Sequence, residues 1–286
     1  MADDTFTFPG SDGVPVFTYR WRPEGETRAV LQIAHGMGEH ALRYRGALQP
    51  LIDAGIAVYA NDHRGHGKTS PHALGDFGPG GFAALIDDMA VLARRIREKE
   101  PGKPLFLMGH SMGSFAAQVF VAEHSDLIDG YVLSGSAALD KLEAPKGGLS
   151  AIGAGMAKPR TPFDWLSRDD AEVDKYIADP LCGFTVNEKG RAAMFAAAGP
   201  ALDPAKLATI RASLPIYVFA GDEDPINAKL TRLTPLVDRY RGLGIGDIET
   251  DYYAGGRHEM LNETNRDEVV ANLKSWIERH IAKVPT

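Results

Sequence analysis

The sequence predicts an α/β fold, in which helices flank a mostly parallel sheet of eight strands and a helical cap is inserted. Short apolar runs alternate with helical patterns over residues 28–133 and again after residue 214, which is typical of a sheet with helices on both faces. Residues 137–205 contain no buried-strand run but many glycines and prolines. We therefore expect a core of residues 1–136 and 206–286 and a cap of residues 137–205.

The first half of the core follows from the spacing of its apolar residues. Two strand-like runs around a Pro-Gly turn predict an opening antiparallel hairpin, and four further apolar runs predict buried strands. Apolar residues on one side of longer segments predict helices between them. The expected strands are 5–8, 14–21, 28–34, 56–60, 104–108 and 130–133, and the expected helices are 43–54, 82–99 and 114–120.

The second half of the core resumes after the cap. Residues 214–220 and 247–253 are the last two expected strands, and residues 228–241 are an expected helix between them. A C-terminal helix starts near Asn265 with a core-facing apolar stripe, while His280 in this helix is expected to be exposed or to cap its end. Within the cap, the pattern indicates short helices over 169–178 and 188–198.

A G-x-S-x-G motif, residues 109–113, lies between an expected strand and an expected helix. This context predicts a nucleophile elbow, a sharp turn that lifts the Ser111 hydroxyl clear of the sheet. Strand and helix pass close together there, so side chains at positions 109 and 113 would clash. The turn also aims the Met112 backbone N–H at a developing oxyanion.

An acid and a base are expected in two later loops. The loop after residue 220 offers three carboxylates, of which we favour Asp224 as the acid and keep Asp222 as the alternative. The glycine-containing loop after residue 253 carries His258. We predict that His258 takes the proton of Ser111 and returns it to the leaving group, while Asp224 holds the imidazole tautomer.

A second oxyanion donor is expected from residues 35–40, which follow the strand 28–34 and are named here the oxyanion loop. Its sequence is His-Gly-Met-Gly-Glu-His, and its small residues let the backbone curl towards Ser111. The backbone N–H of Met37 is the predicted partner of the Met112 N–H.

Three other motifs have competing interpretations. Gly36-x-Gly38-x-x-Ala41 with Asp62 resembles a dinucleotide fingerprint, but a cofactor would leave the elbow and the acid–histidine pair without purpose. Gly67-Lys68-Thr69 resembles a phosphate-binding motif whose first glycine is missing. His63-x-x-His66 has the spacing of two metal ligands without a supporting helix motif. We expect residues 62–67 to be a structural turn that braces the site, and we predict no cofactor and no metal.

Composition narrows the function classes. The net charge is −7 and no block of Lys or Arg is long enough for a nucleic-acid partner. Cys182 is the only cysteine, which excludes an internal disulfide framework and a cysteine-based zinc site and fits a reducing cytosol. No apolar run approaches the ~20 residues that span a bilayer, and the acidic first residues predict no signal peptide. We therefore expect a cytoplasmic protein.

Together these motifs resemble the monoacylglycerol lipase and lysophospholipase group of the serine α/β-hydrolases, the serine aminopeptidase sequence family. The resemblance covers nearly the whole chain, and one departure is Ser114, where many relatives carry glycine. It implies the α/β-hydrolase fold, in which the order Ser111, Asp224, His258 is expected. The residues that carry it are 35–40, 62–70, 109–113, Gly221-x-x-Asp224-Pro225 and His258.

The resemblance further implies a carboxylic-ester hydrolase for a single-chain acyl lipid, with the cap forming an acyl tunnel. The methionines of the cap make it an adaptable surface, so we also expect peripheral contact with the inner face of a membrane. The alternatives are a carboxylesterase, thioesterase or acyltransferase of short acyl esters, a peptidase, and a catalytically silent ligand receptor. The oligomeric state stays open. The expected pocket residues, whose alternative role is only to pack the cap on the sheet, are Met156, Phe163, Trp165, Leu166, Met194 and Phe195.

Overall fold

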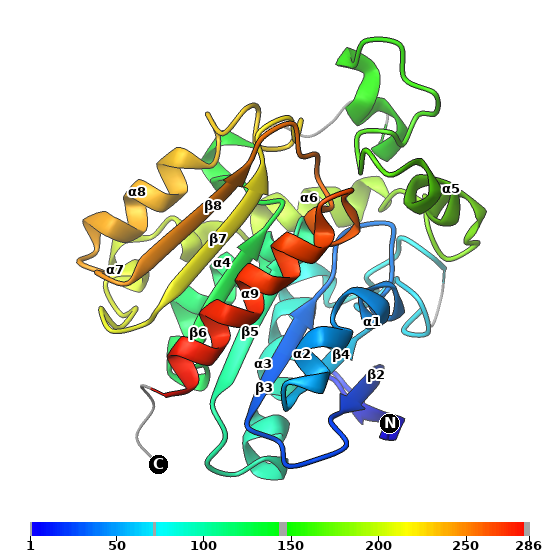
Figure 1. Cartoon of the computed structure of the whole chain (residues 1–286). Helices are drawn as coiled ribbons and strands as arrows, with labels where there is room; N and C mark the ends of the chain where they lie inside the picture. The colour runs from blue at the N-terminus through cyan, green and yellow to red at the C-terminus, as the bar shows by residue number, and fades with distance from the viewer. Residues whose placement is uncertain (1, 71–72, 143–147, 283–286) are drawn as a thin grey trace.

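An eight-stranded sheet runs through the molecule in the order β1-β2-β4-β3-β5-β6-β7-β8 (Figure 1). The computed structural model describes residues 2–70, 73–142 and 148–282. The first two strands form an antiparallel hairpin, the second also pairs antiparallel with β4, and all other pairs are parallel, which confirms the predicted fold class. The strands are β1 (Ala2–Pro9), β2 (Pro15–Arg22), β3 (Ala29–Ala34), β4 (Ile56–Asn61), β5 (Leu105–His110), β6 (Gly130–Ser134), β7 (Ile216–Gly221) and β8 (Ile248–Tyr253).

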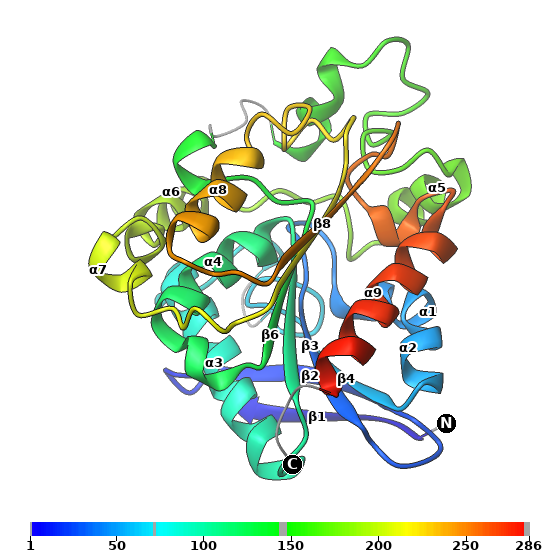
Figure 2. The ribbon, with the colours of Figure 1, turned by 60° about the vertical axis from the view of Figure 1, so that its left-hand side comes forward.

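Helices cover both faces of the sheet (Figure 2). One layer contains α3 (Gly81–Lys99), α4 (Met112–His124) and α8 (Thr234–Gly242), and the opposite layer contains α1 (Tyr44–Ala47), α2 (Gln49–Asp53) and α9 (Arg266–Ile281). Successive strand residues point to opposite faces, so neighbours join different cores. Val30 and Leu107 belong to the first core, whereas Leu31 and Met108 belong to the second.

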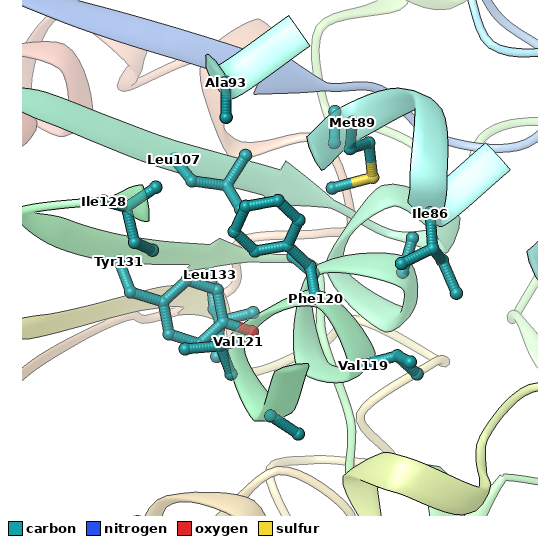
Figure 3. Packing of buried hydrophobic residues seen from close by; sticks show 14 of the residues in the cluster. Ile86, Met89, Ala93, Leu107, Val119, Phe120, Val121, Ile128, Tyr131 and Leu133 are labelled. Carbon is teal, nitrogen blue, oxygen red and sulfur yellow. The ribbon is translucent and has the colours of Figure 1, made fainter. Parts of the chain in front are cut away.

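The helix that follows the elbow is fixed by the first core. Phe120 of α4 is fully buried and lies among Met89 and Ala93 of α3 and Leu107 of β5 (Figure 3). Burying a side chain of this size contributes about 1.5–3 kcal/mol. Because α4 begins directly after Ser111, this packing also holds the start of the helix, and therefore the elbow, against the sheet.

The predicted cap connects β6 to β7 and holds no strand among its described residues, and its residues 143–147 lie outside the described part. In Figure 1 its first part lies at the top of the view and α5 at the upper right, whereas α6 is near the centre and α7 at the left. The expected short helices 169–178 and 188–198 are confirmed as α5 and α6. The elements of the cap are η3 (Leu139–Lys141), η4 (Leu149–Gly155), α5 (Asp170–Ala178), α6 (Glu188–Ala196), η5 (Gly199–Ala201) and α7 (Pro204–Leu207).

Two expected helices differ from the structure for backbone reasons. The segment 43–54 is divided into η1 (Ala41–Arg43), α1 and α2, and Pro50 lies in the first turn of α2, where its missing N–H costs nothing. The segment 228–241 becomes helical only at Thr234. Ala228, Lys229 and Leu230 all have positive φ angles (50°, 56° and 67°), so the chain makes a left-handed turn before α8 starts.

The expectation that His280 is exposed was wrong, because this side chain is buried. Its Nδ1 lies 2.7 Å from the carbonyl oxygen of Trp276 and its Nε2 lies 3.2 Å from Asp247 Oδ2. The predicted apolar stripe of α9 is confirmed, with Leu273, Trp276 and Ile277 fully buried. Two short elements complete the described chain, η2 (Ser125–Leu127) and η6 (Met260–Asn262).

Within the described residues, every helix is too short or too polar to cross a lipid bilayer.

Candidate active site

Ser111 occupies a strained turn between β5 and α4. Its φ of 51° and ψ of −121° are unusual for a residue with a side chain, and such strain persists only where the surroundings impose it. The Ser111 N–H donates to the carbonyl of Ser134 on the neighbouring strand (3.0 Å). Its own carbonyl accepts from the N–H groups of Ser114 (2.8 Å) and Phe115 (3.1 Å). Sheet and helix together therefore hold the turn.

The two glycines of the motif allow this close approach. A β-carbon added at Gly109 would lie 2.6 Å from the carbonyl oxygen of Gly113, and one added at Gly113 would lie 2.0 Å from that of Ala34. Both are backbone atoms that cannot move aside. The elbow is thus built by the steric constraint that the sequence predicted.

Asp224 and His258 meet in the interior although 33 residues separate them in the chain. His258 Nδ1 lies 2.9 Å from Asp224 Oδ2, and both side chains are buried. Asp222, the alternative acid, instead accepts the Gly255 N–H (2.7 Å) and so shapes the histidine's loop. The two loops touch directly, since a β-carbon at Gly221 would lie 2.0 Å from the Gly256 carbonyl oxygen.

The surroundings of His258 make it the basic histidine of the site. Burial alone would lower its pKa, but the charge and hydrogen bond of Asp224, with the charge of Glu259, raise the pKa above the ordinary value of 6.5. The ring of His110 lies 4.7 Å from that of His258, and burial together with the His258 charge lowers the pKa of His110 to about 4. At neutral pH, His110 is therefore uncharged, and of the two rings His258 binds a proton more readily.

A buried ionic bridge ties the oxyanion loop to the residue after His258. Glu39 Oε1 accepts from the Gly36 N–H (2.6 Å) and the Tyr44 hydroxyl (2.7 Å). Arg43 donates to Glu39 Oε2 (2.6 Å) and, through two nitrogens, to both oxygens of Glu259 (2.6 and 2.7 Å). Burial would raise the pKa of both carboxyls, but Arg43 holds each below its ordinary value. We name these three side chains the Glu39–Arg43–Glu259 bridge.

Sequence reasoning missed this bridge, although a signal was available. Glu39 directly follows the glycines of the oxyanion loop, and Glu259 directly follows the predicted base. Charged residues beside catalytic loops are candidates for positioning them. The bridge brings the two loops into one rigid unit, and Gly36 approaches Ser111 so closely that an added β-carbon would lie 3.2 Å from Ser111 Cβ.

A cavity of about 110 Å³ opens between the sheet and the cap, and Ser111, His258, Met37 and Met112 all line it. Four predicted pocket residues line it as well, namely Trp165, Leu166, Met194 and Phe195. Apolar residues that sequence reasoning did not single out complete much of the wall. They are Phe82, Phe115, Leu139, Leu142, Leu149, Ile152 and Ile226.

Two predicted pocket residues are absent from the described lining of this cavity. Phe163 packs its ring against Tyr176, with centroids 5.2 Å apart. Met156 packs at the edge of the cap's own apolar cluster and lines a separate surface cavity that includes Asp224. Phe163 and Met156 therefore pack against other cap residues and lie outside the described lining of the cavity that contains Ser111.

Residues 62–67 form the bracing turn that the sequence predicted. The Asp62 carboxylate accepts from the N–H groups of Ala41 (2.9 Å) and Lys68 (2.8 Å), and the His63 N–H donates to His35 Nε2 (2.9 Å). The dinucleotide interpretation requires a helix whose N-terminus faces the phosphates. Here the glycines lead instead into the three-residue η1.

Comparisons with known proteins agree with this geometry. The family model described as serine aminopeptidase, S33, matches residues 25–265, more than half of the chain. The chain is 31% identical to a monoacylglycerol lipase of Mycolicibacterium smegmatis over 96% of its length and 97% of the relative's, and 29% identical to a monoglyceride lipase of Mus musculus over 95% and 89%. A thermostable carboxyl esterase from Bacillus coagulans superposes with a TM-score of 0.86 at 29% identity, covering 98% of this chain and 99% of that one. The chain therefore belongs to the serine aminopeptidase, S33, family, and it is a carboxylic ester hydrolase with the α/β-hydrolase fold.

Proposed function

We propose that the chain hydrolyses single-chain acyl lipids of the monoacylglycerol or lysophospholipid type through an acyl-enzyme on Ser111. The observation that carries the proposal is the shared cavity, because Ser111 and His258 lie in the same space as a wall of apolar side chains. An acyl chain is a ligand that such a wall binds well, since each buried methylene contributes about 0.8 kcal/mol. The names of the two relatives, monoacylglycerol lipase and monoglyceride lipase, support the same substrate class.

In this mechanism Ser111 Oγ attacks the ester carbonyl while His258 Nε2 takes the hydroxyl proton. Asp224, hydrogen-bonded to Nδ1, fixes the tautomer and stabilises the imidazolium that forms. His258 then gives the proton to the departing alcohol, which leaves the acyl group on Ser111. A water molecule, activated by His258, hydrolyses that ester and releases the fatty acid.

The oxyanion is held by the backbone N–H groups of Met37 and Met112. In the described part of the chain neither group donates a hydrogen bond to the protein, and both residues line the cavity beside Ser111. Met112 is the first residue of α4, so the helix dipole adds to its field. Removing one such donor from an acyl-transfer site typically lowers kcat by about 10²–10³.

A fluorophosphonate probe tests the nucleophile. The native chain should be labelled and Ser111→Ala should not. Ser114→Ala is the matched control, because Ser114 lies one helical turn further on, is buried, and donates its hydroxyl to the Ser111 carbonyl (2.6 Å). Labelling should persist in that variant. Equal labelling of Ser111→Ala would remove Ser111 from the mechanism.

A substrate panel tests the acyl-lipid assignment. It compares monoacylglycerols and lysophosphatidylcholines of increasing chain length with short p-nitrophenyl esters, acyl thioesters and aminoacyl p-nitroanilides. The proposal predicts the highest kcat/KM for a long-chain lipid ester. Faster cleavage of short esters or thioesters would support the general esterase or thioesterase, and faster cleavage of the anilides would support the peptidase.

We also propose that the cap contacts lipid surfaces peripherally. Three large apolar side chains that are strongly exposed lie in the cap: Ile177 (46%), Phe195 (44%) and Leu202 (38%). Exposed apolar side chains near a lipid-binding cavity favour partition into a bilayer interface. Co-flotation with phosphatidylcholine vesicles should fall in Ile177→Ser/Leu202→Ser, and unchanged flotation would contradict this role.

A further inference from the structure

Three donor atoms suited to a metal ion meet where the oxyanion loop contacts the cap. His40 Nε2, a carboxylate oxygen of Asp179 and Cys182 Sγ all lie within 4.8 Å of one another. His40 Nε2 is 2.8 Å from Asp179 Oδ2, and the His40 side chain is buried, with 7% exposed. Imidazole, carboxylate and thiolate are the ligands that Zn²⁺ takes in proteins.

A turn presents two of these donors together. The Cys182 N–H donates to the Asp179 backbone carbonyl (3.0 Å), and the Leu181 N–H donates to Asp179 Oδ1 (2.8 Å). Asp179 and Cys182 therefore face the same side with two residues between them, a spacing that paired ligands commonly have in structural zinc sites.

The same cap segment is already joined to the oxyanion loop. The Gly38 carbonyl accepts from the Tyr176 hydroxyl (2.8 Å) and from the Gly183 N–H (2.9 Å). These two bonds flank the turn that carries Asp179 and Cys182, and His40 follows Gly38 by two residues. The third donor is thus held opposite the first two by contacts that do not involve any of the three.

Charges of both signs lie near the three donors. The positive charge of Arg43 acts on Asp179 and Cys182, but its guanidinium is already paired with two carboxylates in the Glu39–Arg43–Glu259 bridge. Asp62 also interacts with His40, which adds a further negative charge. A surface cavity of about 540 Å³ reaches Asp179 and gives an ion a route from solvent.

We propose that His40, Asp179 and Cys182 bind a Zn²⁺ ion that clamps the cap onto the oxyanion loop, with water as the fourth ligand. Zinc–ligand distances of about 2.0–2.3 Å place tetrahedral donors about 3.5 Å apart, so the widest pair closes by about 1 Å. Asp179 and Cys182 are only partly buried. The thiol proton passes to solvent as the zinc–sulfur bond forms. His40 binds the ion through Nε2 as the neutral ring with its proton on Nδ1, so the Nε2–H···Asp179 hydrogen bond is replaced by one bond from each side chain to the ion. The proposal departs from the sequence-based expectation of no cysteine-based zinc site, which rested on the single cysteine; His40 lies far from Asp179 and Cys182 in the chain.

Titration of the full chain with Zn²⁺ and with Co²⁺ tests the site. Calorimetry should show one ion bound per chain, and Co²⁺ should produce a thiolate-to-metal charge-transfer absorption. Cys182→Ser should abolish that absorption, and His40→Ala should weaken binding by about 100-fold or more, because even the loss of an outer-shell partner costs 10–100-fold. Saturating Zn²⁺ should raise the Tm of the native chain by about 5 °C and leave that of Cys182→Ser unchanged.

Glu249→Gln is the matched control, since it alters the second carboxylate–histidine group of the described chain, formed by Asp247, Glu249 and His280. It should keep the charge-transfer absorption and the Tm shift. The Tm of metal-free Cys182→Ser should match that of the native chain, which separates loss of the site from loss of the fold. Absence of stoichiometric binding, or an absorption that survives in Cys182→Ser, would overturn the proposal.

Discussion

The edge of the sheet that carries Ser111 and the cap above it are built in different ways. At the sheet edge, backbone atoms approach so closely that glycine is required at positions 109, 113 and 221, and the charged side chains are buried and paired. The cap consists of short helices and turns, and three of its large apolar side chains are exposed. The proposed function thus assigns the chemistry to a frame with little steric tolerance, and substrate selection to cap side chains that can be exchanged.

This contrast predicts that substitutions in the two regions affect different properties of the protein. At the sheet edge a small change should cost turnover or folding outright, since each group has one geometry that satisfies it. In the cap an equal change should alter which ester is preferred. The following experiments test that division, beginning with the largest expected effect.

Asp224→Asn should lower kcat by about 10⁴ while KM changes little, because an amide cannot hold His258 in the required tautomer or stabilise its charged form. The measurement is steady-state hydrolysis of a p-nitrophenyl ester. Glu223→Gln is the matched control in the same loop, since Glu223 is exposed and forms a surface ion pair with Lys229. It should stay within about twofold of the native rate. A comparable loss of kcat in both variants would contradict the assignment of Asp224 as the catalytic acid.

Gly113→Ala should destabilise the fold by at least about 3 kcal/mol, because its β-carbon would lie 2.0 Å from the Ala34 carbonyl oxygen. Gly155→Ala in the cap is the counterpart, since an added β-carbon there meets nothing within 4 Å. Its free energy of unfolding should change by less than about 1 kcal/mol, towards greater stability. Urea denaturation of both variants measures the difference, and equal midpoints would contradict the contrast between the regions.

Much of this frame could be predicted from the sequence because it is encoded locally. The segment strand–Gly-x-Ser-x-Gly–helix predicts the elbow turn from local sequence alone, and the short apolar runs predict the strands. The Glu39–Arg43–Glu259 bridge could not be predicted, because its members are ordinary charged residues until the fold brings two loops together. The lining of the cavity could not be predicted either. Met156 and Met194 were both expected in the pocket, and only tertiary packing separates the one outside the cavity from the one inside it.

Acid should destabilise the sheet-edge frame through its buried histidines. Burial lowers the pKa of His35, His63, His66 and His110, so these side chains stay neutral in the folded state while the unfolded chain binds protons near pH 6.5. Each therefore contributes stability above pH 6.5 that is lost, by about 1.4 kcal/mol per pH unit, as the pH falls below it. For His66 and His110, whose pKa in the folded state is about 4, this loss of stability continues down to about pH 4. The urea midpoint should fall steeply between about pH 6.5 and pH 5.

The pKa of His258 is shifted in the opposite direction to that of the other buried histidines. The pH dependence of stability can therefore be separated from that of activity. Its pKa is raised, so its contribution to stability is complete below pH 6.5 and is lost as the pH rises through the folded value. Catalysis needs the neutral ring, so the acid limb of kcat/KM should have its midpoint above 6.5. A midpoint below that value would contradict the dominance of Asp224 and Glu259 over burial. His66→Gln should reduce the acid dependence of the urea midpoint by about one proton and leave the activity midpoint unchanged.

The smallest effect should come from the cap, and it should depend on the substrate. Met194 lines the cavity with Ser111, so Met194→Ala should lower kcat/KM for a long-chain monoacylglycerol about tenfold through lost contact with the acyl chain. A short p-nitrophenyl ester should lose far less, since it does not reach that wall. Met156→Ala is the control of equal chemistry, because Met156 lies in the cap but outside this cavity. If both variants lowered both rates alike, the cap would act through stability alone, and the division between a frame that performs the reaction and a wall that selects the substrate would not hold.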